Sequence, residues 1–253
     1  MIKLTRPPKP QILVDNERIW VQPLLEAIKV HGSYKDIPKL DKEKLISFYR
    51  HNEIKQSLFP SSNYKCAFCE GKPSENGNIE VEHFLPKSIY PEQIFSWENL
   101  LPACRKCNDA KRAHDSHLEP IINPYNEDPE ELFFYTDIRI TPIDNAVDAT
   151  RTVVVCELNS VRLMGPRAEI LVSLHSFDQS LSAALSDLDQ ATGERARNNR
   201  IARIAEGIEV MDRLTANDQR YAGFCRHYLK NSLNYQQAKE ILKAAREESE
   251  ANF

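Results

Sequence analysis

The sequence predicts an α+β protein in which a small cysteine-framed module lies between helical segments. Two Cys-x-x-Cys pairs frame a run that alternates apolar and acidic residues, Ile79 to Phe84, and such alternation is typical of a strand. A helical pattern precedes the module, and leucines recur at helical spacing in the final hundred residues. We therefore expect three segments: an N-terminal arm with helices (1–60), the module (61–118), and a connector with short strands that leads into a helical C-terminal region (119–253).

The composition is ordinary for a globular protein. The chain has 253 residues, of which 41% are hydrophobic and 28% charged, and its net charge is −4. It contains no apolar run of transmembrane length, so we expect no membrane span. The first residues lack an apolar stretch of signal-peptide length followed by a cleavage site, so we expect a cytoplasmic protein.

The N-terminal segment is expected to begin as an arm and to continue as helices. Pro7-Pro8-Lys9-Pro10 favours an extended, polyproline-like arm, which is either a disordered tail or a docking arm. A short helix is predicted at 23–31, ending near Gly32. A second helix is predicted from Asp41, its N-cap candidate, to about Leu58.

Inside the module we expect the strand and one short helix. Neighbouring residues of a strand point to opposite faces, so Glu82 and His83 can share one site only if the strand ends or bends there. Pro86 favours that bend, because proline cannot continue a central strand. A short helix is predicted from Cys107 to Ala113. Two polar residues lie at i and i+3 on one face of this helix, Asn108 and Lys111.

The rest of the chain is expected to begin with short strands and to end in helices. Turn-forming prolines mark the connector, and helical periodicity dominates after it. The predicted elements are strands at 132–135, 138–140 and 152–156, a helix from Asn159 or Ser160 to Gly193, and helices near 195–214 and 217–247, the last one broken near 231–234.

The paired cysteines indicate metal binding rather than disulfides, because the chain has no secretion signal. Four thiolates can surround one tetrahedral Zn²⁺ at about 2.3 Å each. The 34 residues between the pairs exceed the gap of about 15–20 in a simple zinc ribbon, and we interpret the extra length as an active site. Cys156 and Cys225 are expected to be small buried hydrophobes. The predicted zinc ligands are Cys66, Cys69, Cys104 and Cys107.

These residues together resemble the HNH endonuclease family. The matching features are the two cysteine pairs, Glu82-His83 followed by Pro86, Asn99, and the Cys-Asn-x-x-Lys run that contains Asn108. The resemblance implies a ββα-metal (treble-clef-like) HNH core with structural zinc. It also implies a metal-dependent hydrolase that cuts DNA phosphodiester bonds.

The resemblance implies roles for four residues. His83 would be the general base, and a histidine is the side chain whose pKa best suits proton transfer near neutrality. Glu82 and Asn108 would be ligands of a catalytic divalent ion, Mg²⁺ or Mn²⁺, which polarises the phosphoryl oxygen and stabilises the leaving alkoxide. Asn99 would order the loop that holds the histidine. The family often has Asp at the position of Glu82 and often His at that of Asn108.

Several other residues have two interpretations. Lys111 and Arg112 either grip phosphate as substrate-binding residues or form a solvated helix face. Glu80 shares a strand face with Glu82 and either assists the metal or is a solvated carboxylate. The arginines between Arg195 and Arg203 form a basic stripe that contacts DNA, contacts a protein partner or is a solvated face.

The charge of the module constrains how it could bind DNA. From residue 61 to 117 it contains seven basic and eight acidic residues, so it is near neutral. Neutralisation of phosphates supplies most non-specific affinity for DNA. We therefore expect weak DNA binding by the chain alone, unless a local basic face compensates or a partner brings the DNA.

A weaker resemblance extends over the whole chain, to the HNH nuclease subunits of bacterial anti-phage defence systems of the Septu type (PtuB-like). It rests on the proline-rich start, the helical lead-in, the module, the prolines Pro124 and Pro129 of the connector, and the Leu-Asn-x-x-Arg-Leu run at 158–163. This resemblance implies an ATPase partner (PtuA-like) in a hetero-oligomer, which senses or loads DNA and restrains the nuclease.

Two other functions stay open from the sequence. One is a stand-alone restriction-type HNH endonuclease, whose C-terminal part reads a sequence or a modified base. The other is a non-catalytic zinc module whose helical tail binds nucleic acid or protein. A plasmid-nicking assay with Mg²⁺ or Mn²⁺ separates both enzymes from the non-catalytic module.

Overall fold

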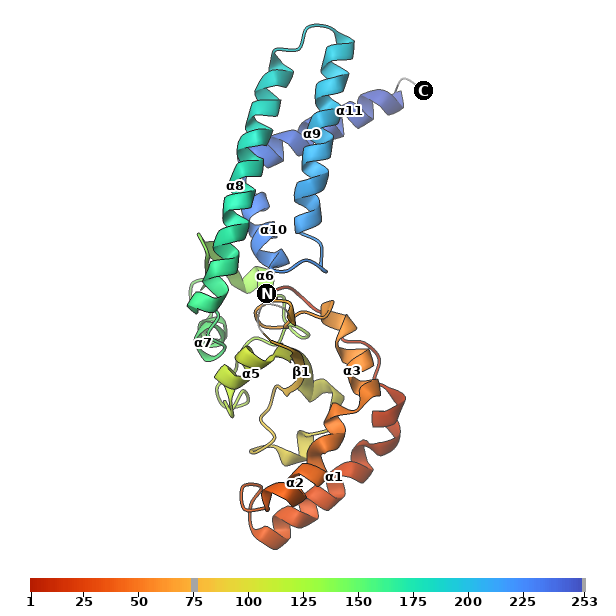
Figure 1. Ribbon diagram of the computed structural model, residues 1–253, viewed down its shortest axis with the longest axis vertical. Coiled ribbons are helices and arrows are strands. Elements are labelled where there is room, and N and C mark those ends of the chain that lie inside the picture. Colours follow the sequence, from red (N-terminus) through yellow and green to blue (C-terminus); the bar gives the residue numbers. More distant parts are fainter. Residues whose placement is uncertain (74–76, 252–253) are drawn as a thin grey trace. The chain divides into compact units, whose positions relative to one another are not determined.

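The computed structural model of the chain describes residues 1–73 and 77–251 (Figure 1). Contacts divide it into two compact units. Unit 1 comprises Met1–Phe134 and Ile140–Leu163, and unit 2 comprises Tyr135–Arg139 and the chain from Met164 onward. The N-terminal helices, expected as a separate segment, thus belong to the same unit as the cysteine pairs. In the described residues the fold is mainly helical with two small sheets, which confirms the α+β class.

The first ten residues form an extended arm that is docked on unit 1, one of the two expected alternatives. The Leu4 amide donates a hydrogen bond to the Pro124 carbonyl at 2.9 Å. The Arg6 guanidinium lies over the Tyr125 ring at 3.9 Å and donates to the backbone carbonyl of Trp97 at 2.7 Å. The arm therefore packs against the end of the loop between the two strands of the module.

The first helix is much longer than predicted. α1 spans Gln11–His31 and has Pro10 at its N-cap and Gly32 at its C-cap. The prediction started it at residue 23, from the apolar pattern of Leu24, Leu25 and Ile28, but the helix begins twelve residues earlier and contains Pro23. The buried hydrophobic side chains of α1 are only Leu13 and Leu24, too few to give a clear periodicity in its first half.

The second predicted helix is three short elements instead of one. α2 (Lys39–Ile46), the 3₁₀ turn η1 (Ser47–Arg50) and α3 (Asn52–Leu58) follow one another, and η2 (Pro60–Ser62) ends the run. The break lies at His51, whose backbone is extended and whose Nδ1 accepts a hydrogen bond from the Glu53 amide. Asp41 lies within the first turn of α2 and is not its N-cap, which is Pro38. The tighter η1 turn contains the buried Tyr49.

The centre of unit 1 is a two-stranded antiparallel sheet followed by a helix. β1 (Ile79–His83) pairs with β2 (Leu100–Cys104), with His83 opposite Leu100. α5 (Arg105–Lys111) follows β2 directly and packs against both strands. β1 and α5 confirm the predicted strand and helix, although α5 begins two residues earlier than predicted. β1 ends at His83, as a site shared by Glu82 and His83 requires.

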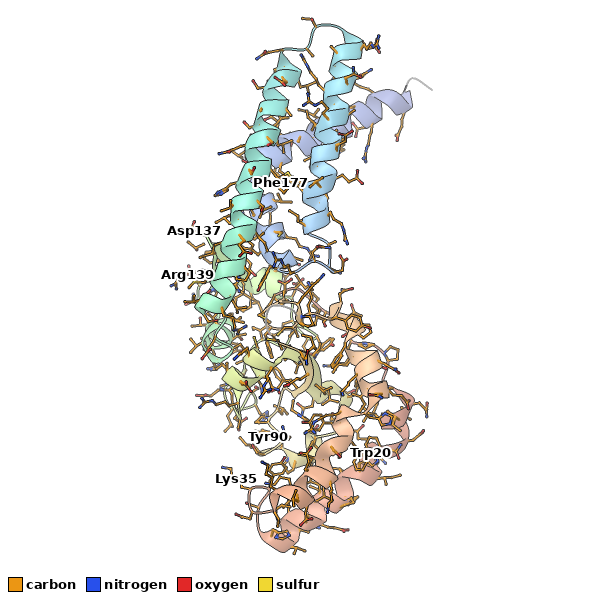
Figure 2. The ribbon with its side chains drawn as sticks, viewed as in Figure 1. Trp20, Lys35, Tyr90, Asp137, Arg139 and Phe177 are labelled. Carbon is orange, nitrogen blue, oxygen red and sulfur yellow. The ribbon has the colours of Figure 1, made fainter. Side chains whose placement is uncertain are left out.

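The loop between β1 and β2 is braced by the N-terminal helices. It contains two 3₁₀ turns, η3 (Pro91–Gln93) and η4 (Trp97–Asn99). Trp20 of α1, labelled in Figure 2, stacks on Phe48 at a centroid distance of 4.8 Å and meets Phe95 edge-on at 5.6 Å. Phe95 and its neighbour Ile94 are fully buried. This packing fixes the part of the loop that faces His83.

One predicted strand of the connector is a helix. α6 (Pro129–Leu132) leads into the predicted β-pair, β3 (Phe133–Thr136) and β4 (Arg139–Pro142). Residues 152–156, predicted as a third strand from their β-branched side chains, lie in or next to α7 (Val147–Val155). Thr152 explains the outcome, because its buried Oγ1 accepts a hydrogen bond from the Ile122 amide and donates one to the Asp148 carbonyl one turn earlier. These contacts outweigh the strand propensity of the valines.

Unit 2 consists mainly of helices, as predicted from its leucine periodicity. α8 (Val161–Asp189) leaves unit 1 and runs antiparallel to α9 (Glu194–Leu214), and α10 (Ala222–Asn231) is followed by α11 (Leu233–Ala251), which packs on α9 (Figure 1). The break near 231–234 is confirmed. Gly193 is the N-cap of α9 and not the end of α8. No helix in the described ranges is long and apolar enough to cross a membrane.

Candidate metal centre and active-site groove

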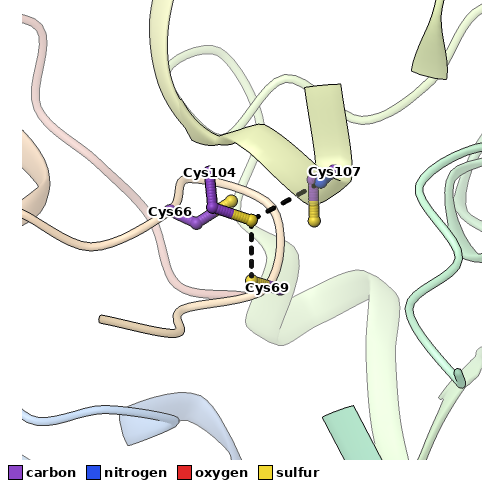
Figure 3. A group of neighbouring side chains, drawn as sticks. All are labelled: Cys66, Cys69, Cys104 and Cys107. Atoms are coloured by element: carbon purple, nitrogen blue, oxygen red, sulfur yellow. Dashed lines mark hydrogen bonds between the residues drawn. The ribbon is translucent and has the colours of Figure 1, made fainter. Parts of the chain in front are cut away.

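The four cysteines of the two pairs converge on one point (Figure 3). Their Sγ atoms lie within 4.8 Å of one another, and all four side chains are buried. A tetrahedral zinc ion with thiolates at about 2.3 Å places its sulfur atoms roughly 3.8 Å apart. The Sγ atoms of Cys69 and Cys104 are 3.9 Å apart. The group could hold a metal ion, and its four sulfur donors fit zinc.

Hydrogen-bond donors surround the sulfur atoms of the cluster. The amides of Gly71 and Cys107 point at the Sγ atoms of Cys69 and Cys104, at 3.4 and 3.5 Å. The Arg162 guanidinium donates to Cys107 Sγ at 3.7 Å. Four thiolates around a divalent cation carry a net charge of −2, which these donors would offset.

The cluster also shifts the acidity of its thiols. Burial raises the pKa of Cys66, whereas hydrogen bonds from the neighbouring cysteines, first Cys107, lower the pKa of Cys104. A bound cation is what deprotonates coordinating thiols outright, so the donor set is suited to a metal.

His83, at the end of β1, is buried and only 2% exposed. Its Nε2 lies 2.9 Å from the Ile94 carbonyl oxygen. A carbonyl oxygen only accepts hydrogen bonds, so Nε2 carries the proton and Nδ1 keeps a lone pair. The ring meets Tyr49 edge-on at 4.6 Å. Burial and then the charge of Lys87 lower the pKa of His83 to about 3, so the imidazole is neutral at physiological pH and can accept a proton.

Asn99 holds the loop that carries the partner of His83. Its Oδ1 accepts a hydrogen bond from the Leu85 amide at 2.6 Å, and its Nδ2 donates to the carbonyls of Leu85 and Gln93 at 3.1 and 3.0 Å. Gln93 directly precedes Ile94 in the chain. Asn99 thus makes hydrogen bonds to both ends of the loop from 85 to 93, and such contacts can hold the loop in one conformation.

Glu82 and Lys111 form a buried ion pair. Lys111 Nζ lies 3.0 Å from Glu82 Oε1 and donates to the His83 carbonyl at 2.9 Å. The Lys111 side chain has no exposed area and that of Glu82 is 6% exposed. Burial raises the pKa of Glu82, and Lys111 opposes that shift. Lys111 is therefore not on a solvated helix face, because both of its contacts lie inside the unit.

Glu80 and Asn108 occupy a different environment from that pair. Asn108 Nδ2 donates a hydrogen bond to Glu80 Oε2 at 3.1 Å, and both side chains are half-buried. Asn108, predicted to act beside Glu82, contacts Glu80 instead. The two carboxylates of β1 thus differ, since Glu82 is buried against a lysine whereas Glu80 is accessible beside an amide.

Glu80, Glu82 and Asn108 line a groove with a cavity volume of about 530 Å³, whereas His83, Asn99 and Lys111 lie outside its lining. Sequence reasoning missed the contribution of η1 and α3 to this groove, because no local signal shows that the helices before the first cysteine pair pack on the module. Arg112 is exposed and outside the lining. The charged side chains of the lining are Arg50, Lys55, Lys87 and Arg105 on the basic side and Glu80, Glu82 and Asp109 on the acidic side.

Comparison with known proteins supports a family resemblance. No family model matches the chain. The chain is similar to two proteins named Septu protein PtuB. The one from Bacillus thuringiensis is 39% identical over 130 residues, which cover 51% of this chain and 44% of that protein. The one from Bacillus mycoides (strain KBAB4) is 27% identical over 224 residues, covering 74% of this chain and 73% of that protein.

A third relative comes from a phage. Protein ea31 of Escherichia phage lambda is 31% identical over 110 residues, which cover 39% of this chain and 36% of that protein. The alignments with the first and third relatives span less than half of the length of those proteins. The predicted PtuB-like resemblance is confirmed, and it suggests a component of a defence system.

Proposed function

From the similarity to Septu proteins PtuB, we propose that the chain is a metal-dependent HNH endonuclease that cuts DNA as the nuclease of an anti-phage defence complex. In this proposal β1, β2 and α5 are the ββα-metal core and the cysteine cluster holds structural zinc. The observation that carries the proposal is the state of His83. It is a neutral imidazole, held with its proton on Nε2 by the Ile94 carbonyl, at the end of a strand that lines an open groove.

The groove supplies the other groups that phosphodiester hydrolysis needs. His83 Nδ1 takes a proton from the attacking water, and Asn99 keeps the ring oriented through the loop that contains Ile94. Glu82, Glu80 and Asn108 offer the carboxylate and amide oxygens that hard divalent cations prefer. A bound Mg²⁺ or Mn²⁺ would polarise the phosphoryl oxygen and stabilise the leaving oxygen.

The low pKa of His83 is compatible with a role as base once DNA is bound. After burial, the causes of the lowered pKa are the positive charges of Lys87, Lys111 and Arg50. Phosphates bound in the groove bring negative charge close to these cations. Neutralisation of these cations raises the pKa of His83, while the larger effect of burial remains.

We propose that an ATPase subunit of the PtuA type is the partner that delivers DNA to this groove. The basis is the near-neutral charge of the module, which gives the chain little general affinity for DNA. A nuclease with little affinity of its own is silent until a partner raises the local DNA concentration. Restraint of this kind suits an enzyme that would otherwise damage the host.

The test is plasmid nicking by zinc-loaded protein, with Mg²⁺ or Mn²⁺ and an EDTA control, alone and with the product of an adjacent ATPase gene. We expect conversion of supercoiled to nicked or linear plasmid that needs the divalent ion and increases strongly with the partner. Salt-resistant cleavage by the chain alone would favour a stand-alone enzyme. If no cleavage occurs under any of these conditions, the chain is instead a non-catalytic zinc module.

A further inference from the structure

We propose that Lys55 and Lys87 hold the phosphate backbone of the nucleic acid in the groove, in place of Lys111 and Arg112. The inference rests on the proposed function and names its substrate contacts. Lys55 comes from α3, in the N-terminal helices, and Lys87 follows the end of β1. Both side chains line the groove together with Glu80 and Asn108.

The two cations predicted from the sequence are badly placed for this task. Lys111 Nζ has a carboxylate oxygen at 3.0 Å and a carbonyl oxygen at 2.9 Å, and its side chain has no exposed area. To reach phosphate it would have to leave Glu82 as an unpaired buried charge, which is strongly unfavourable. Arg112 follows α5 and is outside the groove lining.

Two of the four cations in the groove already have partners. The Arg50 guanidinium donates to Glu43 and to the Tyr49 hydroxyl, and it lies over the Tyr49 ring at 4.8 Å. Arg105 lies 3.7 Å from Asp109, one turn further along α5, although both side chains are largely exposed. Arg50 is thus held by Glu43 and Tyr49, and the charge of Arg105 is partly neutralised by Asp109.

Lys55 and Lys87 are different. In the described part of the chain, neither has a carboxylate within ion-pair distance, and both are half-buried. Lys87 Nζ lies 5.6 Å from the centre of the Tyr49 ring, whose edge is against His83. The charge of Lys87 is also the main electrostatic cause, after burial, of the lowered pKa of His83. A cation without an ion pair beside His83 is placed to bind a phosphate of the backbone in the groove.

This geometry changes the role of the N-terminal helices. Because Lys55 belongs to α3, the groove is complete only when the helices before the first cysteine pair are packed on the module. The sequence left open whether a local basic face compensates for the near-neutral charge of the module. The local basic face exists, but it is small and half of its cations are already paired, so the affinity of the chain for DNA should be modest and very sensitive to salt.

The experiment measures binding of the full, zinc-loaded chain to a short fluorescent duplex without added Mg²⁺ or Mn²⁺, over a series of salt concentrations. Each phosphate contact contributes about 0.9 to the slope of log K against log salt concentration. We expect Lys55→Ala and Lys87→Ala each to lower the magnitude of the slope by about 0.9, and the double variant by about 1.8. Lys55→Arg and Lys87→Arg should keep the wild-type slope, because they keep the charge.

The matched control is Lys106→Ala, which removes an exposed cation of α5 that does not line the groove. Its slope should equal that of the wild type. An unchanged slope in the Lys55/Lys87 double variant, with a wild-type melting temperature, would overturn the inference, as would the absence of any wild-type binding at low salt. Binding with the expected slopes but no cleavage in Mg²⁺ or Mn²⁺, both alone and with the product of the adjacent ATPase gene, would uphold the groove assignment and refute the nuclease.

Discussion

The cysteine cluster and the groove both take residues from α5, but they are built in opposite ways. The cluster is a closed set of four buried side chains of one kind, with donors fixed around the sulfur atoms. The groove is open and lined by charges of both signs. α5 serves both, since Cys107 belongs to the cluster and its neighbour Asn108 to the groove. We therefore expect that substitutions at neighbouring positions, Cys107 and Asn108, affect folding and the proposed activity separately.

The largest expected effect is on the side of the cluster. Cys104→Ser should abolish zinc binding and unfold unit 1, because structural zinc sites supply folding free energy on the order of 10 kcal/mol. Zinc content by elemental analysis and thermal melting measure the result. Cys156→Ala is the matched control, since Cys156 is equally buried but lies outside the cluster. A folded, active Cys104→Ser protein without zinc would show that the cluster is not needed for the stability of unit 1.

The next largest effect concerns the buried ion pair of Glu82 and Lys111, of which Glu82 also lines the groove. Lys111→Met should cost about 3–5 kcal/mol of unfolding free energy, because it leaves the Glu82 carboxylate buried without its partner. Zinc content should stay at the wild-type value. The double variant Glu82→Leu/Lys111→Met should recover most of the stability, since an apolar pair often replaces a buried ion pair at little cost. Chemical denaturation of all three proteins measures this, and equal loss in the double variant would show that the pair is not the cause.

A smaller effect should appear as a dependence of stability on pH. The unfolded chain protonates His83 below about pH 6.5, whereas burial keeps it neutral in the folded protein down to a pKa of about 3. The unfolded state therefore binds the extra proton, and the free energy of unfolding falls as pH drops through this window, by about 1.4 kcal/mol per pH unit. The full stability is present above pH 6.5, and about 2 kcal/mol should be lost at pH 5.

The variant His83→Asn should flatten this part of the stability profile between pH 7 and pH 5. Urea unfolding at several pH values provides the comparison. A wild-type profile that matches His83→Asn over this range would mean that the histidine is not held neutral inside the protein.

The smallest expected effect on stability belongs to the groove itself. Glu80→Gln should leave the melting temperature unchanged, because Glu80 is half-exposed and the amide can still bond to Asn108. It should weaken Mn²⁺ binding in calorimetry by at least the roughly tenfold that loss of an outer-shell partner costs. Asn108→Ala should behave in the same way, and high Mn²⁺ should restore part of its cleavage. Unchanged Mn²⁺ affinity in both variants would place the divalent ion elsewhere.

The parts of the fold that the sequence predicted well are those with local signals. The alternation at 79–84 predicted β1, and leucine periodicity predicted the helices of unit 2. The cysteine spacing predicted a cluster that the side chains do form. In each case the signal lies within a few residues of the feature, so no knowledge of distant contacts was needed.

The features that the sequence did not predict depend on contacts between distant residues. Thr152 makes a helix where its neighbours favour a strand, because it satisfies the amide of Ile122, which lies 30 positions earlier. Arg162 supports Cys107 from 55 positions away. Lys111 looked like a phosphate contact because the burial of its helix face is not visible in the sequence. Tertiary contacts therefore determine the secondary structure at Thr152 and the side-chain environments of Arg162 and Lys111, and local sequence does not show them.

The central claim, that the groove performs chemistry which the cluster only supports, is tested most directly by His83→Ala. Cleavage by this variant, zinc content and DNA affinity should be measured on the same preparation. We expect a loss of cleavage of about 10²–10⁴-fold, as for removal of a general base, with zinc content and DNA affinity unchanged. Cleavage close to that of the wild type, or loss of zinc, would show that His83 is structural and that the nuclease interpretation of the groove is wrong.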